Sequence, residues 1–126
     1  MSEPTRRRSW PRKFHAAFVG AKLGVRGQSS FFVHFFVATM VIVAALILRV
    51  SAAEWCLLVL AITLVLTAEM FNSALEWLAR AITDEDHAHI AGALDIASAA
   101  VLIAALGAVA IGLLVFVPRF MFMLGL

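Results

Sequence analysis

Three long apolar runs dominate the chain, and short polar stretches separate them. The runs extend over about residues 31–49, 54–81 and 93–117. Each run is long enough for a helix that crosses a membrane, which needs about 20 mostly apolar residues. The pattern therefore predicts three membrane-spanning helices. We expect the third to end at Pro118, because proline cannot continue a helix in the usual way.

A further helix is predicted ahead of the first span, over residues 9–28. Four apolar residues recur there at spacings of four, three and four: Phe14, Phe18, Ala21 and Val25. Basic residues lie elsewhere around the helix. Such an amphipathic helix lies on a membrane surface, either as an anchor for anionic lipid or in contact with a substrate. Residues 1–8 are expected to be a disordered basic arm. Residues 9–126 are then a single membrane domain.

Composition excludes a small soluble domain, because 63% of the residues are hydrophobic and only 14% are charged. The single cysteine, Cys56, has no partner for a disulfide or a cysteine-based metal site. The predicted fold class is all-α: an integral membrane protein with three spanning helices and an N-terminal amphipathic surface helix. We expect no nucleic-acid partner.

The basic residues predict the orientation of the chain. Seven of the ten lysines and arginines precede the first span. Since positive residues stay in the cytoplasm, the N-terminus and the polar loop at 82–92 are predicted to be cytoplasmic, and the C-terminus outside. The segment "VSAAEW" after the first run could pass for a signal-peptide cleavage site, but that run is as long as a full span.

The second span ends in "AEMFNSALEWLAR", where polar residues interrupt the apolar pattern. On a helix they fall within an arc of about 100°, so they share one face: Glu69, Asn72, Ser73, Glu76 and Arg80. Asp95 and Ser98 are expected at matching depth on the third span. Ionisable groups inside a span are costly unless paired or wetted, so this face is a predicted functional site.

The residue types of this face suit phosphate chemistry. Two carboxylates and an amide are hard oxygen ligands, which suit Mg²⁺ with a phosphate completing its shell. The deeper Glu69 could accept a proton from a hydroxyl group. In a purely structural interpretation, Glu76 and Arg80 pair along the helix and Glu69 is a protonated packing residue. His34, inside the first span, either lines a lipid site or hydrogen-bonds a neighbouring helix.

The pattern E-x-x-N-[ST]-A-[IL]-E, present as "EMFNSALE", resembles the prokaryotic diacylglycerol kinase family, which includes the undecaprenol kinases. His87, "LDIASAAVL", "FHAAFVGAKLGV", "SFFVHFF" and "EWCLLVL" match in order, and the similarity covers residues 14–118. The resemblance implies a homotrimer in the bacterial inner membrane with active sites shared between subunits. Such enzymes transfer the γ-phosphoryl group of ATP to a lipid hydroxyl with Mg²⁺.

Residue roles follow from the same resemblance. It implies Glu69 as the general base and Asn72 as a positioning group, with Glu76 as a Mg²⁺ ligand that also lies at the nucleotide. Further expected nucleotide contacts are Glu85, His87 and Asp95. The lipid substrate is expected beside Glu69, Ser98 and Lys22.

Three positions depart from the family pattern. Gln28 replaces a second metal-binding glutamate and is expected to be a neutral, weaker ligand for Mg²⁺. Leu94 replaces a lysine, and Arg80 replaces an aspartate. We hypothesise that Arg80 neutralises phosphate in place of the lost lysine, the alternative being that it pairs with Glu76 or lipid phosphate. Two other functions stay open: a family member that binds nucleotide or lipid without turnover, and an ion or proton pathway. Against the pathway, no acidic or amide-bearing residues continue through the outer half of any span, whereas a conducting path needs polar lining across the whole membrane.

Overall fold

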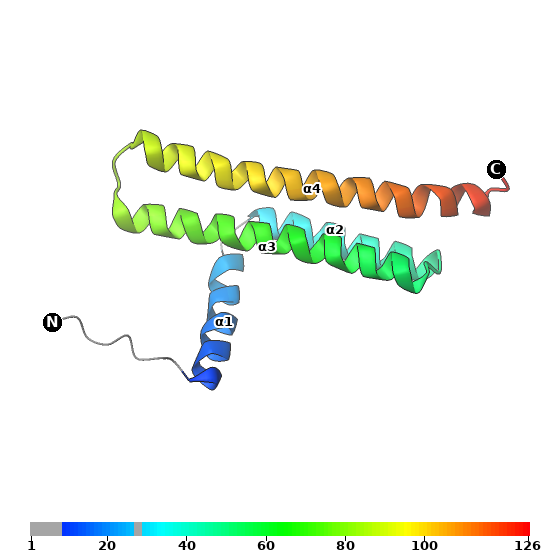
Figure 1. The fold of residues 1–126 in the computed structure, drawn as a ribbon, viewed down its shortest axis with the longest axis horizontal. Coiled ribbons are helices and arrows are strands. Elements are labelled where there is room, and N and C mark those ends of the chain that lie inside the picture. The colour runs from blue at the N-terminus through cyan, green and yellow to red at the C-terminus, as the bar shows by residue number, and fades with distance from the viewer. Residues whose placement is uncertain (1–8, 27–28) are drawn as a thin grey trace.

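The computed structural model describes residues 9–26 and 29–126, and these contain four helices and no strand. The helices are α1 (Trp10–Val25), α2 (Ser29–Ile47), α3 (Ala52–Ile82) and α4 (Ala88–Met123). Helices α2, α3 and α4 lie alongside one another, and α1 crosses them at a steep angle (Figure 1). The predicted all-α class and the N-terminal helix are confirmed. The predicted arm at 1–8 and Gln28 lie outside the described residues.

Three of the helices are long and apolar enough to cross a membrane, as predicted. Helix α2 has 19 residues, α3 has 31 and α4 has 36. At 1.5 Å per residue, α2 is about 28 Å long, close to the thickness of the hydrocarbon core, whereas α3 is about 46 Å long. Because α3 exceeds the core, part of it must reach the headgroup region or water.

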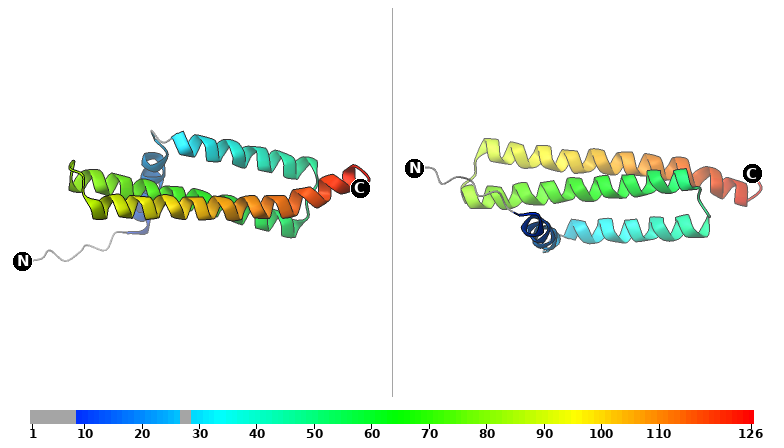
Figure 2. Two further views of the ribbon diagram at one scale, coloured as in Figure 1. Left: turned by 90° about the horizontal axis from the view of Figure 1, so that it is seen from above. Right: turned by 60° about the horizontal axis from the view of Figure 1, so that its bottom comes forward.

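Helix α3 is the central element of the bundle. It lies between α2 and α4, as the right-hand view of Figure 2 shows, and it runs antiparallel to α4 over most of its length. A small core forms at the end away from the α3–α4 loop: Ala45, Val50, Leu58 and Val115. The polar face of α3 lies toward the opposite end of the helix.

Helix α1 exposes its large aromatic side chains. Trp10, Phe14 and Phe18 are each more than half exposed. The ammonium group of Lys13 lies 4.6 Å from the centre of the Trp10 ring, and that of Lys22 lies 4.8 Å from the centre of the Phe18 ring. Exposed aromatic rings flanked by lysines are typical of helices at a membrane surface, where rings enter the lipid and charges stay in water.

Helix α1 meets α3 through Gly24, which is buried. A Cβ atom at this position would collide with Sδ of Met70, so the absence of a side chain permits the close approach. Ala74 and Trp77 line the hollow between the two helices. Since α3 continues from Trp77 to Ile82, its last turn projects beyond this contact.

Arg119 of α4 ties the ends of three helices together. It donates hydrogen bonds to Glu54 of α3, including one of 2.9 Å from Nε, and to the backbone carbonyl groups of Leu48 and Arg49 after α2. Glu54 also closes a capping box with Ser51 at the start of α3. One guanidinium group therefore satisfies both a carboxylate and carbonyl groups that α2 leaves unpaired.

The third apolar helix is longer than predicted at both ends. It begins at Ala88, where the side chain of His87 accepts a hydrogen bond from the backbone N–H of His89, and it continues through Pro118 to Met123. Proline removes one backbone hydrogen bond and tends to bend a helix, and α4 bends toward its C-terminal end (Figure 2). The contacts of Arg119 hold the turn that follows, so expecting the helix to end at Pro118 was wrong.

We expect Arg119→Leu to lower the temperature of thermal unfolding, because hydrogen bonds to the Glu54 carboxylate and to two backbone carbonyl groups are lost. Thermal unfolding of the purified protein in detergent would measure the change. In Arg119→Lys the charge remains but the forked geometry is lost, so part of the stability should return. If Arg119→Leu lowers stability equally in the wild type and in a Glu54→Gln background, the pairing of Arg119 with Glu54 is contradicted, because the effects of substitutions at interacting residues are not additive.

Candidate active site

Glu69 lies inside the bundle, at the contact between α3 and α2. Its side chain is almost fully buried, and both carboxylate oxygens have a partner from α2. Nε2 of His34 lies 2.8 Å from Oε1, and the hydroxyl group of Ser30 donates to Oε2 at 3.3 Å. The prediction that His34 hydrogen-bonds a neighbouring helix is confirmed. The role of Ser30 was not predicted, although it precedes His34 by one helical turn.

Asn72 and Glu76 follow Glu69 along the polar face of α3, toward the C-terminal end of the helix. The amide nitrogen of Asn72 donates to Oε1 of Glu76 at 3.0 Å. Nη2 of Arg80 lies 3.7 Å from Oε2 of Glu76, so the pair in the purely structural interpretation is present. The Arg80 side chain is 69% exposed, and ion pairs at such exposure contribute little to stability. A contribution to folding stability is therefore a weak explanation for the presence of Arg80 beside Glu76.

Two buried polar atoms on this face have no hydrogen-bond partner among the described residues. They are Oδ1 of Asn72 and Oγ of Ser73. Buried polar groups in folded proteins are nearly always hydrogen-bonded, so each exception calls for a ligand, a water molecule or an ion. The free amide oxygen stands next to Glu76, whose carboxylate is the kind of hard ligand that Mg²⁺ prefers.

The donor set fits a hard divalent metal ion that takes part of its coordination shell from water and substrate. Within residues 9–26 and 29–126, no group of three or more histidine, cysteine or acidic side chains could hold a metal. Mg²⁺ is usually bound by one or two carboxylates with phosphate oxygens and water, and rarely by a complete protein cage. Glu76 and Asn72 are the described residues that would hold it.

A polar hollow of about 400 Å³ opens where α3 ends and α4 begins. Four of its lining residues were predicted to lie at a nucleotide: Glu76, Arg80, Glu85 and His87. Leu94 lines it as well. The fold therefore brings the second-span residues and the loop residues to one place. Asp86 also lines the hollow and was not predicted.

Three other predicted site residues are exposed and are not among the hydrogen-bond partners of Glu69 in the described part of the chain. Asp95 and Ser98 are exposed, and the hydroxyl group of Ser98 donates to the carbonyl group of Leu94 in its own helix. Among the described residues, Asp95 has no hydrogen-bond or ion-pair partner. Lys22 is exposed on α1. These side chains face outward from a single copy of the chain.

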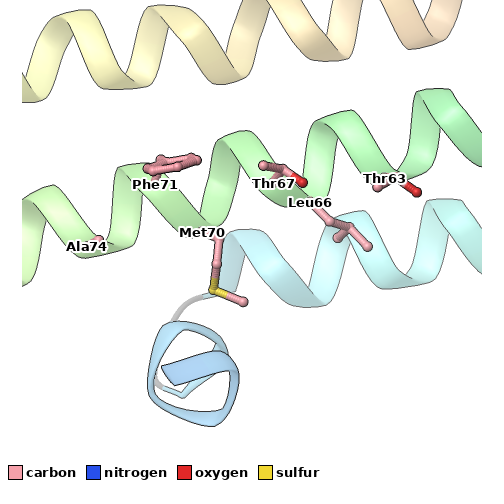
Figure 3. A pocket seen from close by; sticks show the side chains of 6 residues that line it. All are labelled: Thr63, Leu66, Thr67, Met70, Phe71 and Ala74. Atoms are coloured by element: carbon pink, nitrogen blue, oxygen red, sulfur yellow. The ribbon is translucent and has the colours of Figure 1, made fainter. Parts of the chain in front are cut away.

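An apolar hollow of about 420 Å³ runs along α3 on another side of the helix (Figure 3). Its lining side chains are labelled there: Thr63, Leu66, Thr67, Met70, Phe71 and Ala74. Met70 points toward α1 and, with Ala74, also lines the hollow between α1 and α3. Apolar residues in a span look alike in sequence, so no pattern could have identified this surface.

Comparison with known proteins adds to this geometry. The profile of prokaryotic diacylglycerol kinases matches residues 15–116, which include the whole polar face of α3. The chain belongs to the prokaryotic diacylglycerol kinase family. This membership places it among the membrane lipid kinases, and the resemblance seen in the sequence is confirmed.

Two relatives in this kinase family cover most of the chain. The undecaprenol kinase of Bacillus subtilis is 32% identical over 111 residues, which are 85% of this chain and 90% of the relative. The diacylglycerol kinase of Synechocystis is 32% identical over 117 residues, 87% of this chain and 67% of the relative. No solved structure matches the chain significantly. Arg119 lies outside the segment that the family profile matches.

Proposed function

We propose that this lipid kinase transfers the γ-phosphoryl group of ATP to the hydroxyl group of a membrane lipid, with Mg²⁺. The observation that carries the proposal is the continuous polar face of α3. It leads from the buried carboxylate of Glu69, through Asn72 and Glu76, to the hollow beside Arg80. A lipid hydroxyl and a water-soluble phosphate donor must meet at such a boundary between membrane and water.

Three residues on this face, Glu69, Asn72 and Glu76, have a role at the site of the proposed transfer. Glu69 accepts the proton of the lipid hydroxyl as the lipid oxygen attacks the γ-phosphorus, while the bond from that phosphorus to the bridging oxygen breaks and ADP leaves. Asn72 holds Glu76 through its amide nitrogen and presents its free oxygen beside it. When bound, Mg²⁺ neutralises charge on the phosphate oxygens. Since phosphoryl transfer depends mostly on positioning and charge neutralisation, a rigid helical face suits it.

The polyphosphate is placed in the hollow at the end of α3. Arg80 there offers a guanidinium group to phosphate oxygens, while Glu85 and His87 lie at its rim toward the nucleoside. We place this end of the bundle in the cytoplasm, where ATP is found and where the basic residues ahead of the first span direct the N-terminus. The C-terminus is then outside the inner membrane.

A trimer with shared active sites would account for the outward-facing polar residues. Asp95 and Ser98 are exposed on α4, where lipid would be an unfavourable neighbour for a carboxylate. Packing against α3 of a second copy would bring Asp95 to the nucleotide and Ser98 and Lys22 to the lipid. Gln28 would add a neutral oxygen ligand to the metal.

A second candidate function is a binder that does not turn over its ligand. The observation in its favour is Leu94, an apolar residue in the wall of the proposed phosphate site. An apolar side chain gives no electrostatic stabilisation to a transferring phosphoryl group. In this alternative the nucleotide or the lipid is held without transfer.

Transfer of label from γ-labelled ATP in mixed micelles decides between the two. Diacylglycerol and undecaprenol are offered side by side with Mg²⁺, since relatives carry the names of both kinases. We expect label in one of the lipids and none when Glu69→Gln replaces the wild type. A folded wild-type protein that labels neither lipid, but binds a fluorescent ATP analogue, would favour the binder.

A further inference from the structure

The contact between α2 and the polar face of α3 runs through a histidine. His34 and Ser30 stand one turn apart on α2, and each reaches a different oxygen of the Glu69 carboxylate. The Glu69 side chain is 5% exposed and that of His34 is 21% exposed. A buried carboxylate is costly unless it is paired or hydrogen-bonded, so these two partners are what make Glu69 tolerable inside a span.

The proposed base role of Glu69 decides which partner donates in its contact with His34. A general base must be ionised, and an ionised carboxylate only accepts hydrogen bonds, so in this role Nε2 of a neutral His34 carries the hydrogen and donates it to Oε1. The serine hydroxyl donates to Oε2. Each oxygen has a second acceptor position. These remaining positions are available to the hydroxyl group of a substrate.

We propose that His34 is a positioning residue for Glu69 in the transfer reaction. The inference rests on the proposed function and deepens it. His34 fixes the rotation of the carboxylate, so that a free acceptor position of Glu69 faces the lipid hydroxyl. His34 itself takes no proton from the substrate. A carboxylate that rotates freely would meet the hydroxyl in the correct geometry less often.

The test separates positioning from folding with two replacements of different chemistry. His34→Leu removes the donor, and we expect kcat to fall about fivefold, the value of one ordinary hydrogen bond, with KM for ATP unchanged. His34→Gln keeps an N–H group close to the place of Nε2, and we expect kcat to stay within about twofold of wild type. Thr39→Val removes an exposed hydroxyl from the same helix and is the matched control.

A spectroscopic measurement on the same proteins does not depend on turnover. The ¹⁵N resonances of the histidine side chains report which nitrogen carries the proton, and His34→Leu identifies the signals of His34. We expect wild-type His34 to be protonated at Nε2 and its signals to shift in Glu69→Gln. Unchanged signals, or equal kcat in His34→Leu and wild type, would overturn the inference while leaving the kinase intact. A wild type without transfer would overturn both.

Discussion

Glu69→Gln is expected to lower kcat for lipid phosphorylation by about 10²- to 10⁴-fold, the usual contribution of a general base. The amide has nearly the same shape as the carboxylate and still accepts a hydrogen bond from His34, so the contact between α2 and α3 should survive. An amide cannot take up the proton of the lipid hydroxyl. The loss should therefore appear in kcat, with KM for ATP little changed.

Glu54→Gln is a suitable control for this variant. Glu54 is also a carboxylate of α3 with a hydrogen-bonded partner, but it lies at the other end of the helix, where it contacts Arg119. We expect this variant to lose stability and to keep its turnover at low temperature. If Glu69→Gln retains more than about a tenth of wild-type kcat, Glu69 is not the base, because one proton transfer is worth more than that.

The polar face of α3 was predictable because helical geometry alone decides which of its residues share a side. Glu69, Asn72 and Ser73 lie together and are buried, and Glu76 and Arg80 follow toward the end of the helix. A repeat of 3.6 residues fixes this arrangement without knowledge of any neighbour. The three apolar helices were predictable for a similar reason, since length and hydropathy depend on local sequence only.

The partners of that face were not predictable to the same degree. His34 was expected to contact a neighbouring helix, but its partner depends on how far α2 slides along α3, and apolar sequence does not record that register. The continuation of α4 past Pro118 depends on Arg119, which finds its partners 65 to 71 residues away in the chain. In the proposed trimer, the placement of Asp95 and Ser98 beside Glu69 would depend on the packing between copies of the chain, which sequence pattern does not record.

Arg80→Ala is expected to lower kcat/KM for ATP at least tenfold, or about 1.4 kcal/mol, through KM or kcat. Arg80 lines the polar hollow beside Glu76, and more than half of its side chain is free to reach a ligand there. A guanidinium group that contacts phosphate oxygens neutralises charge that otherwise opposes binding and transfer. If kcat/KM for ATP is unchanged in Arg80→Ala, Arg80 does not contact phosphate and only pairs with Glu76.

A second substitution tests whether charge is the reason for the loss. Leu94 lines the same hollow as Arg80, from the first turns of α4. If Arg80 supplies the cation that a lysine would supply at 94, then Leu94→Lys in the Arg80→Ala background should restore most of the lost kcat/KM. Leu94→Met in that background fills similar space without charge and is the matched control.

The double variant separates the two explanations of Arg80. Restoration by lysine and not by methionine means that the site needs one positive charge and accepts it from α3 or from α4. No restoration by either residue, with turnover retained in Arg80→Lys, would mean that the charge must come from α3. Equal restoration by both residues would contradict phosphate neutralisation by Arg80, because a neutral thioether attracts no phosphate.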